Sequence, residues 1–291
     1  MEYIELFIES FLGVLNWAVR QVFFRVPNSE NYFWGLIIIS LVVWTLELSF
    51  PWRKNQKILR KDFWLDLFYM FFNFFLFSIF IDGFYKIINK ASYNLLSLNA
   101  DSISLFKLSN FSPIIQLVIF FVILDFFQWI THVLLHKYPF LWKFHKVHHS
   151  VKEMGFAAHL RYHWMENILY KPLKVLAIML IGGFEPEQAF IIHFLAITIG
   201  HLNHANINLS YGPLKYIFNN PVMHLYHHAY SVPNKFKTGV NFAISLSVWD
   251  YMFKTNYIPN ADGNIKLGYE GDNRMSKDFI GQLFYGFKKG D

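Results

Sequence analysis

Long apolar runs alternate with short polar segments through the first half of the chain, and their length predicts membrane helices. The runs are Tyr32–Phe50, Phe63–Ile88 and Ile114–Ile130. A helix rises about 1.5 Å per residue, so roughly 20 apolar residues cross a hydrocarbon core about 30 Å thick. We therefore expect each of these three runs to span a membrane.

Two further apolar regions carry interruptions. Residues 3–24 include Glu5, Glu9 and Arg20, so this segment either spans the membrane or lies in its interface as an amphipathic helix. Farther along, Glu166–Ile181 and Gln188–Gly200 flank a Gly-Gly-Phe-Glu-Pro-Glu break. We expect the second region to form a helical hairpin that enters and leaves from the cytosolic side.

The distribution of charge predicts the orientation. Pro51 ends the first run and is followed by a basic cluster, which by the positive-inside rule faces the cytosol; its members are Arg53, Lys54, Lys57, Arg60 and Lys61. The third run then returns to the cytosolic surface, where the first histidines follow it. The more polar residues from Asn203 onward, punctuated by prolines, are expected to form a cytosolic cap.

These patterns predict an all-α fold, a multi-pass membrane bundle of about four spans with a cytosolic helical cap that holds a histidine-rich dimetal site. We divide the chain into an N-terminal membrane region (1–124), a catalytic region (125–255) and a C-terminal tail (256–291). The protein is expected to be integral to the membrane, with its metal site on the cytosolic side. No internal repeat or linker is evident.

Composition supports the membrane prediction and narrows the chemistry. The chain is 54% hydrophobic and 16% charged, whereas a soluble domain has about a quarter of charged residues. Because the chain has no cysteine, it has no disulfides, iron–sulfur clusters or thiolate nucleophiles. The net charge of +6 accompanies no nucleic-acid-binding motif, so membrane topology explains it better.

All 13 histidines lie between His132 and His228, and ten have spacings that place their imidazoles on one helix face. Such spacing suits metal chelation. Because ten nitrogen ligands exceed the need of one tetrahedral site, the sequence predicts two metal ions. The ten expected ligands are His132, His136, His145, His148, His149, His201, His204, His224, His227 and His228.

Around these histidines the sequence resembles the fatty acid hydroxylase and sterol desaturase superfamily of integral-membrane di-iron enzymes. The resemblance covers roughly residues 125–255 and is most specific in the two H-x-x-H-H motifs. It includes D-x-x-x-W-x-x-H-x-x-x-H from Asp125, R-x-H-x-x-E from Arg161, and Trp249-Asp250. The other matching positions are Pro139, Leu141, Trp142, Ser150 and the H-x-N-x-x-x-x-G-P-L stretch from His204.

The resemblance implies a di-iron oxygenase that hydroxylates or desaturates a lipid C–H bond with dioxygen as co-substrate. Histidine alone leaves the metal open, since imidazole suits both iron and zinc. The sequence has no flavin or nicotinamide fingerprint, so an external electron donor, a protein or a small reductant, is required. The expected partners are a lipid substrate, the membrane and this donor, with no nucleic acid.

Four residues are expected to support the ligands without binding metal: Asp125, His163, Glu166 and Asp250. Asp125 lies two helical turns before His132, where a carboxylate can accept the distal N–H of a ligating imidazole and fix its tautomer. The resemblance does not require His159. His193 is expected as a buried or cavity-lining residue in the hairpin.

Two other functions use the same histidines. A membrane zinc hydrolase is the main alternative, although the chain lacks H-E-x-x-H and a catalytic zinc needs only three protein ligands. A metal carrier or haem-binding membrane protein is the second alternative. A transport path would place polar residues in mid-membrane, whereas these clusters follow the ends of the spans.

Overall fold

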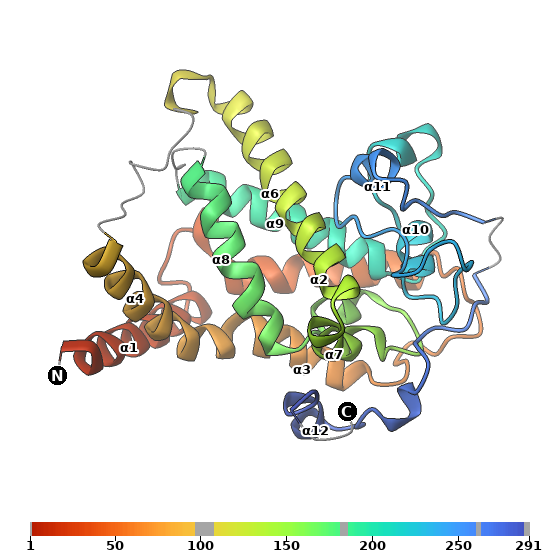
Figure 1. The fold of residues 1–291 in the computed structure, drawn as a ribbon, viewed down its shortest axis with the longest axis horizontal. Coiled ribbons are helices and arrows are strands. Elements are labelled where there is room, and N and C mark those ends of the chain that lie inside the picture. Colours follow the sequence, from red (N-terminus) through yellow and green to blue (C-terminus); the bar gives the residue numbers. More distant parts are fainter. Residues whose placement is uncertain (1, 97–107, 181–185, 260–262, 288–291) are drawn as a thin grey trace.

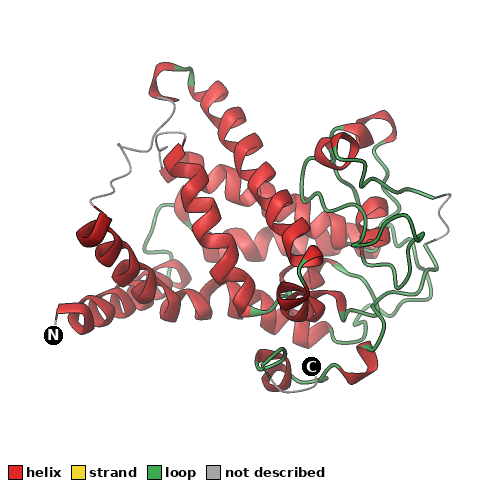
Figure 2. Cartoon of the chain, viewed as in Figure 1, coloured by secondary structure: helices red, strands yellow, loops and turns green. Residues whose placement is uncertain are grey.

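The computed structural model describes residues 2–96, 108–180, 186–259 and 263–287. Within these ranges every regular element is a helix, as Figures 1 and 2 show. The prediction of an all-α fold is therefore confirmed for the described residues. The expected Gly-Gly break at residues 182–183 lies outside them.

The N-terminal half consists mainly of long helices. In chain order the elements are α1 (Glu2–Val22), the short 3₁₀ helix η1 (Asn28–Glu30), α2 (Tyr32–Ser49), α3 (Phe63–Phe71), the π-helix η2 (Phe72–Leu76), α4 (Phe77–Leu96), η3 (Leu108–Asn110) and α6 (Pro113–Lys137).

The C-terminal half begins with helices and ends with loops that contain short helices. Its elements are α7 (Pro139–His149), η4 (Phe156–Leu160), α8 (Trp164–Leu180), α9 (Pro186–His204), η5 (Gly212–Tyr216), α10 (Pro221–His227), α11 (Val248–Met252), η6 (Asp272–Arg274) and α12 (Phe279–Leu283). Within the bundle, α8 packs against α6, and α9 packs against α2.

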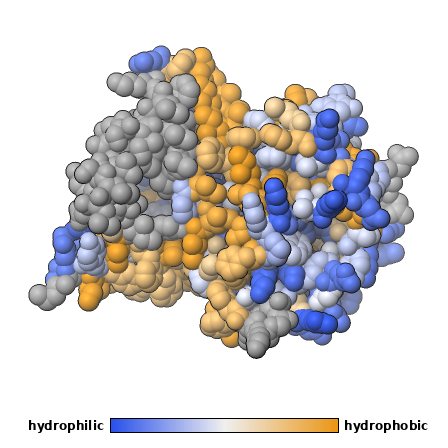
Figure 3. Space-filling model, viewed as in Figure 1, coloured by the Kyte–Doolittle hydropathy of each residue, from blue (hydrophilic) through white to orange (hydrophobic). Residues whose placement is uncertain are grey.

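Three helical stretches are long and apolar enough to cross a membrane, and they coincide with the three expected spans. They are Tyr32–Ser49, Phe63–Phe84 and Pro113–Lys137. Their outward side chains are strongly exposed: Ile114 is 74% exposed and Ile38 is 58% exposed. Figure 3 shows hydrophobic residues in a band over the helical bundle and hydrophilic residues gathered over the looped C-terminal part. This surface fits an integral membrane protein.

A buried charge network connects α3 with the segment that precedes α8. The Arg161 guanidinium donates to Asp66 at 3.1 Å, to Asp62 at 3.2 Å and to the Ser150 hydroxyl at 2.9 Å. Arg60 donates to the other carboxylate oxygen of Asp66. Asp66 is fully buried, so its charge is stabilised by two guanidinium groups rather than by water.

The π-helix η2 contacts the residues on either side of Arg161. Its Asn73 side chain donates to the carbonyls of Leu160 at 3.0 Å and Tyr162 at 2.9 Å. A π-turn adds one residue to the helical repeat, and such turns often occur at functional sites. Here it turns Asn73 toward residues 160–162, next to the centre described below.

Replacing Asp66 with Ala is expected to lower the free energy of unfolding by about 3–5 kcal/mol, because two buried guanidinium groups lose their shared carboxylate. Denaturant unfolding in a neutral detergent measures the change. Glu9→Gln, at an exposed position on α1, is the control and should leave stability within about 0.5 kcal/mol. Equal stability of Asp66→Ala and the wild type would show that the network does not stabilise the fold.

Candidate metal centre

Three helices and the end of α9 bring the histidines together. His132 and His136 lie in the last two turns of α6, and the first H-x-x-H-H occupies the end of α7. The second H-x-x-H-H begins in α10, a short helix that starts at Pro221 after Asn220, whose side chain accepts from the Met223 amide. Proline in the first turn and an asparagine cap both favour helix initiation at this point.

Nine histidines form two adjacent groups in which the nearest ligand nitrogens all lie within 4.8 Å of one another. We name these groups cluster A and cluster B. Cluster A contains His132, His136, His145, His149 and His227; cluster B contains His148, His204, His224 and His228.

The two H-x-x-H-H motifs contribute to the clusters crosswise. In the first motif, His145 and His149 belong to cluster A and His148 to cluster B. In the second motif the first and last histidines belong to cluster B, and His227 belongs to cluster A. Because positions i and i+4 share one helix face more closely than i+3 does, the middle histidine of each motif reaches the other cluster.

Hydrogen bonds fix the proton of each key imidazole on the nitrogen that points away from the centre. In cluster A, His132 Nδ1 lies 2.7 Å from the Phe242 carbonyl and His145 Nδ1 lies 3.0 Å from Glu166 Oε2. A carbonyl and a carboxylate can only accept, so both Nδ1 atoms carry the hydrogen. The two Nε2 lone pairs then face each other at 3.2 Å.

Cluster B has the same arrangement. His148 Nδ1 donates to the Arg161 carbonyl at 2.9 Å, and His204 Nδ1 donates to the Gly200 carbonyl at 2.7 Å. Their Nε2 atoms are 3.3 Å apart, and both present lone pairs to each other. Two neutral acceptors at this distance repel unless a cation lies between them. The nitrogen arrangement therefore fits a bound cation.

Burial excludes the alternative in which protons supply the positive charge. His145, His148 and His224 are all nearly inaccessible to water. Burial lowers the pKa of His148 to about 3 and holds the pKa values of His145 and His224 well below the usual range. The imidazoles are therefore neutral at physiological pH, which is the form that binds metal.

The composition of the clusters bears on which metal they suit. Five imidazoles in cluster A exceed the four ligands of a tetrahedral zinc site. An all-nitrogen donor set also disfavours magnesium and calcium, which prefer oxygen ligands. The residues present fit two transition-metal ions.

Glu166 supports cluster A directly, as expected for this residue. Its Oε2 accepts from His145 Nδ1, and both side chains are only 3% exposed. A carboxylate in this position fixes the tautomer of the imidazole and raises its basicity as a ligand. Glu166 belongs to the first turn of α8, so this helix is tied to the metal centre at its start.

Asp125 and Asp250 were expected to contact metal-binding imidazoles, but both instead contact backbone amides and indole groups. Asp125 accepts from the backbone amides of Ser245 and Leu246 and from the Trp249 indole, so its oxygens contact no histidine. Asp250 accepts from the amides of Phe242 and Ala243, from Trp129 and from Thr255. Together the two aspartates fix residues 242–246, whose Phe242 carbonyl accepts from His132.

His163 and His201 also have contacts that differ from the expectation. His163 Nε2 donates to the Leu283 carbonyl at 2.8 Å, which ties α12 to the start of α8. His201 lies outside both clusters: its ring nitrogens face Ser40 Oγ at 3.1 Å and His159 Nδ1 at 2.9 Å. Both nitrogens of His201 are thus engaged outside the clusters, and the His159 ring it contacts lies 5.2 Å from the His204 ring.

Several carbonyl groups that orient imidazoles have no signal in the sequence. The Phe242 and Val240 carbonyls accept from His132 and His227, and the Arg161 carbonyl accepts from His148. Any residue supplies a backbone carbonyl, so only the fold identifies these groups. Arg161 was singled out because it belongs to the family-like R-x-H-x-x-E motif. The hydrogen bonds of its guanidinium group to Asp62 and Asp66 were not predicted.

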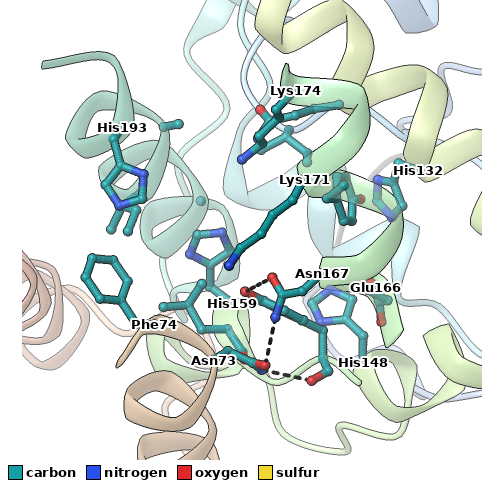
Figure 4. A pocket seen from close by; sticks show the side chains of 18 of the residues that line it. Asn73, Phe74, His132, His148, His159, Glu166, Asn167, Lys171, Lys174 and His193 are labelled. Carbon is teal, nitrogen blue, oxygen red and sulfur yellow. Dashed lines mark hydrogen bonds between the residues drawn. The ribbon is translucent and has the colours of Figure 1, made fainter. Parts of the chain in front are cut away.

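A cavity of about 340 Å³ adjoins both clusters (Figure 4). Histidines from cluster A and cluster B belong to its wall. Apolar side chains, including Phe74, Leu160 and Ile197, line much of the rest. His193 lies on the cavity wall, as Figure 4 shows. The centre is thus reached through a largely apolar space.

Comparison with known proteins places the centre within a known family model. Residues 117–255 match the fatty acid hydroxylase family. This match, which contains all nine clustered histidines, confirms the resemblance to the fatty acid hydroxylase and sterol desaturase superfamily. No solved structure matched the chain.

Similar proteins include two kinds of lipid-modifying enzyme. An ornithine lipid hydroxylase, OlsE of Rhizobium tropici, is 29% identical over 175 residues, which are 60% of this chain and 51% of that protein. The alkylglycerol monooxygenases of Caenorhabditis elegans and Homo sapiens are each 26% identical, over 45% and 46% of this chain. The chain spans about half of the first relative and 25% and 29% of the other two.

The crosswise arrangement makes a specific prediction about metal content. A His136→Ala/His227→Ala variant affects only cluster A and should retain about one metal ion per chain. A His227→Ala/His228→Ala variant, although its changes are adjacent in sequence, removes one ligand from each cluster and should weaken the binding of both ions instead of emptying one cluster. Elemental analysis of purified protein measures the content. Equal loss in the two double variants would contradict the assignment of ligands to clusters.

A Glu166→Gln variant should bind the metal of cluster A about 10- to 100-fold more weakly, because the amide is a poorer acceptor for His145 Nδ1. Competition with a chelator measures the affinity of each ion. Glu187→Gln, at an exposed position of α9, is the matched control and should leave both affinities unchanged. Unchanged affinity in Glu166→Gln would remove Glu166 from the support of the site.

Proposed function

We propose that the fatty acid hydroxylase domain formed by residues 117–255 makes this protein a membrane oxidoreductase that hydroxylates a lipid C–H bond. Dioxygen supplies one oxygen atom to the lipid hydroxyl and the other to water. An external donor supplies two electrons, and two protons come from water. Similarity to an ornithine lipid hydroxylase and to alkylglycerol monooxygenases supports this reaction type.

One observation carries this proposal. Two buried imidazole clusters lie side by side at the end of one largely apolar cavity. A hydrolytic zinc site needs three protein ligands and a water, whereas nine histidines in two groups suit a pair of redox-active ions. We therefore favour two irons over zinc. When bound, an iron pair would supply the electron exchange with dioxygen that C–H oxidation requires.

The residues of the chain have distinct roles in the proposed reaction. The nine clustered histidines hold the metals, and Glu166, with the carbonyls of Phe242 and Arg161, keeps the imidazole protons directed outward. Residues 125–255 are proposed as the catalytic region between the membrane region (1–124) and the tail (256–291). Apolar cavity walls exclude bulk water and favour a lipid chain as the occupant.

The proposed topology places the metal centre at the cytosolic surface. The basic residues after α2, including Arg53 and Lys54, support a cytosolic position for that loop. The loop lies beside the centre, since Arg53 donates to the Met154 carbonyl and Arg60 to the Glu153 carbonyl, both shortly after α7. A multi-pass arrangement with α8 and α9 as a hairpin keeps His204 on this side. An electron donor would then approach from the cytosol.

The test uses protein purified without oxygen, loaded with iron and supplied with a reductant, a membrane lipid extract and isotopically labelled dioxygen. Mass spectrometry should detect a lipid product that contains one labelled oxygen atom. The His148→Ala variant should give product only at the background level, since it removes a ligand of cluster B. Full turnover in this variant would contradict the assignment of His148.

Zinc-loaded wild-type protein is the matched control, because it keeps every side chain and changes only the redox activity of the metal. It should bind lipid but consume no dioxygen. If only zinc-loaded protein modified lipids, and did so by hydrolysis without dioxygen, the oxygenase proposal would be wrong. That outcome would favour the membrane zinc hydrolase.

A further inference from the structure

Two lysines lie in the same cavity as the metal clusters. Lys171 and Lys174 belong to α8 and line the cavity together with His148 and His204. Figure 4 shows both side chains extending from α8 toward His159 and His193 on the other side of the cavity. Charged residues on an apolar cavity wall are costly, and in membrane proteins they usually mark a binding site or a path.

The spacing along α8 places the lysines at a defined distance from the metal centre. Glu166, which accepts from His145, begins the helix. At about 1.5 Å per residue, Lys171 lies roughly 7.5 Å and Lys174 roughly 12 Å farther along the helix axis. The two lysines thus stand at successive distances from the clusters along α8.

The residues that line this cavity include two lysines and one carboxylate. Glu166 is the one carboxylate among the residues that line this cavity, and its Oε2 is held by His145. Asp82, whose charge acts on Lys171, also accepts from Ser10 and pairs with Lys86 at 3.2 Å. Among the described residues, no ion pair includes Lys174.

Lys174 also lines a second cavity, of about 200 Å³, between α6 and α9. Apolar side chains form much of its wall, including Phe120, Phe121, Leu124 and Ile192. Asp125, Gln128 and His193 also line it, so Lys174 is situated between a partly apolar crevice and the cavity that adjoins the clusters. A molecule with one anionic group and long apolar chains can contact the lysines and the apolar walls of both cavities. A free inorganic anion can contact only the lysines.

We propose that Lys171 and Lys174 bind an anionic carboxylate or phosphate group of the lipid substrate and thereby fix which carbon lies beside the metal clusters. The inference rests on the proposed function and names the substrate class for the same site. The anionic group is held on α8, one part of the lipid occupies the crevice between α6 and α9, and the part to be oxidised extends toward His148. The distance along α8 sets the position of oxidation.

Lipid binding, measured by native mass spectrometry in a neutral detergent, tests the proposal without any turnover. The probes are two matched pairs: oleate with methyl oleate, and oleoyl lysophosphatidate with monoolein. Wild-type protein should bind at least one anionic lipid about tenfold more tightly than its neutral partner, as expected for a charge-assisted hydrogen bond in an apolar site. Preference for oleate alone identifies a carboxylate as the bound group, and preference for oleoyl lysophosphatidate alone identifies a phosphate. Preference for both shows that the lysines bind either anionic group.

The variants Lys171→Met and Lys174→Met should each reduce the preference, and the double variant should abolish it. Lys174→Arg should retain most of it. Lys277→Met, at an exposed position outside the cavity, is the control and should bind all four lipids as the wild type does. Unchanged metal content shows that each variant is folded.

Equal binding of anionic and neutral lipids by the wild type would overturn the proposal, as would an undiminished preference in the double variant. Failure of the oxygenase proposal gives a different result, since the lipid then binds with the predicted preference but no oxygenated product forms. The two proposals can therefore fail separately.

Discussion

The structure depends on nine neutral imidazoles whose nitrogen lone pairs converge in a buried space. His132 and His145 face each other through their Nε2 atoms at 3.2 Å, and His148 and His204 do so at 3.3 Å, while their Nδ1 hydrogens are bound by oxygen acceptors on the outside. Without a cation this arrangement repels, because no hydrogen is available between the nitrogens. A cation between the nitrogens would remove this repulsion.

Much of the surrounding fold serves to hold these orientations. Asp66 binds Arg161, whose own carbonyl accepts from His148, so a charge pair on α3 positions a residue of cluster B. Asp250 binds the Phe242 amide in the same way, and the Phe242 carbonyl accepts from His132. In each case a buried carboxylate fixes backbone, and the backbone fixes an imidazole. The charged groups thus stay outside the metal centre while they determine its geometry.

The sequence predicted the helices and singled out the nine histidines that the structure gathers in two clusters, because both depend on local periodicity. Apolar runs predicted the spans, and i, i+4 spacing predicted that His145 and His149 share a target. The spacing separates His148 from His145 and His149, but which cluster His148 joins depends on how α7 and α10 face each other. It also counted His201 among the ligands, whereas Ser40 and His159 engage both of its nitrogens. Asp125 likewise binds a distant loop, a tertiary contact without a local pattern.

The central claim is that the chain holds two metal ions in unequal imidazole environments beside an apolar cavity. Mössbauer spectroscopy of iron-loaded protein tests it most directly, because each iron site gives its own quadrupole doublet. We predict two doublets of equal area, one from the five imidazoles of cluster A and one from the four of cluster B. A single iron environment that saturates at one ion per chain would contradict the claim.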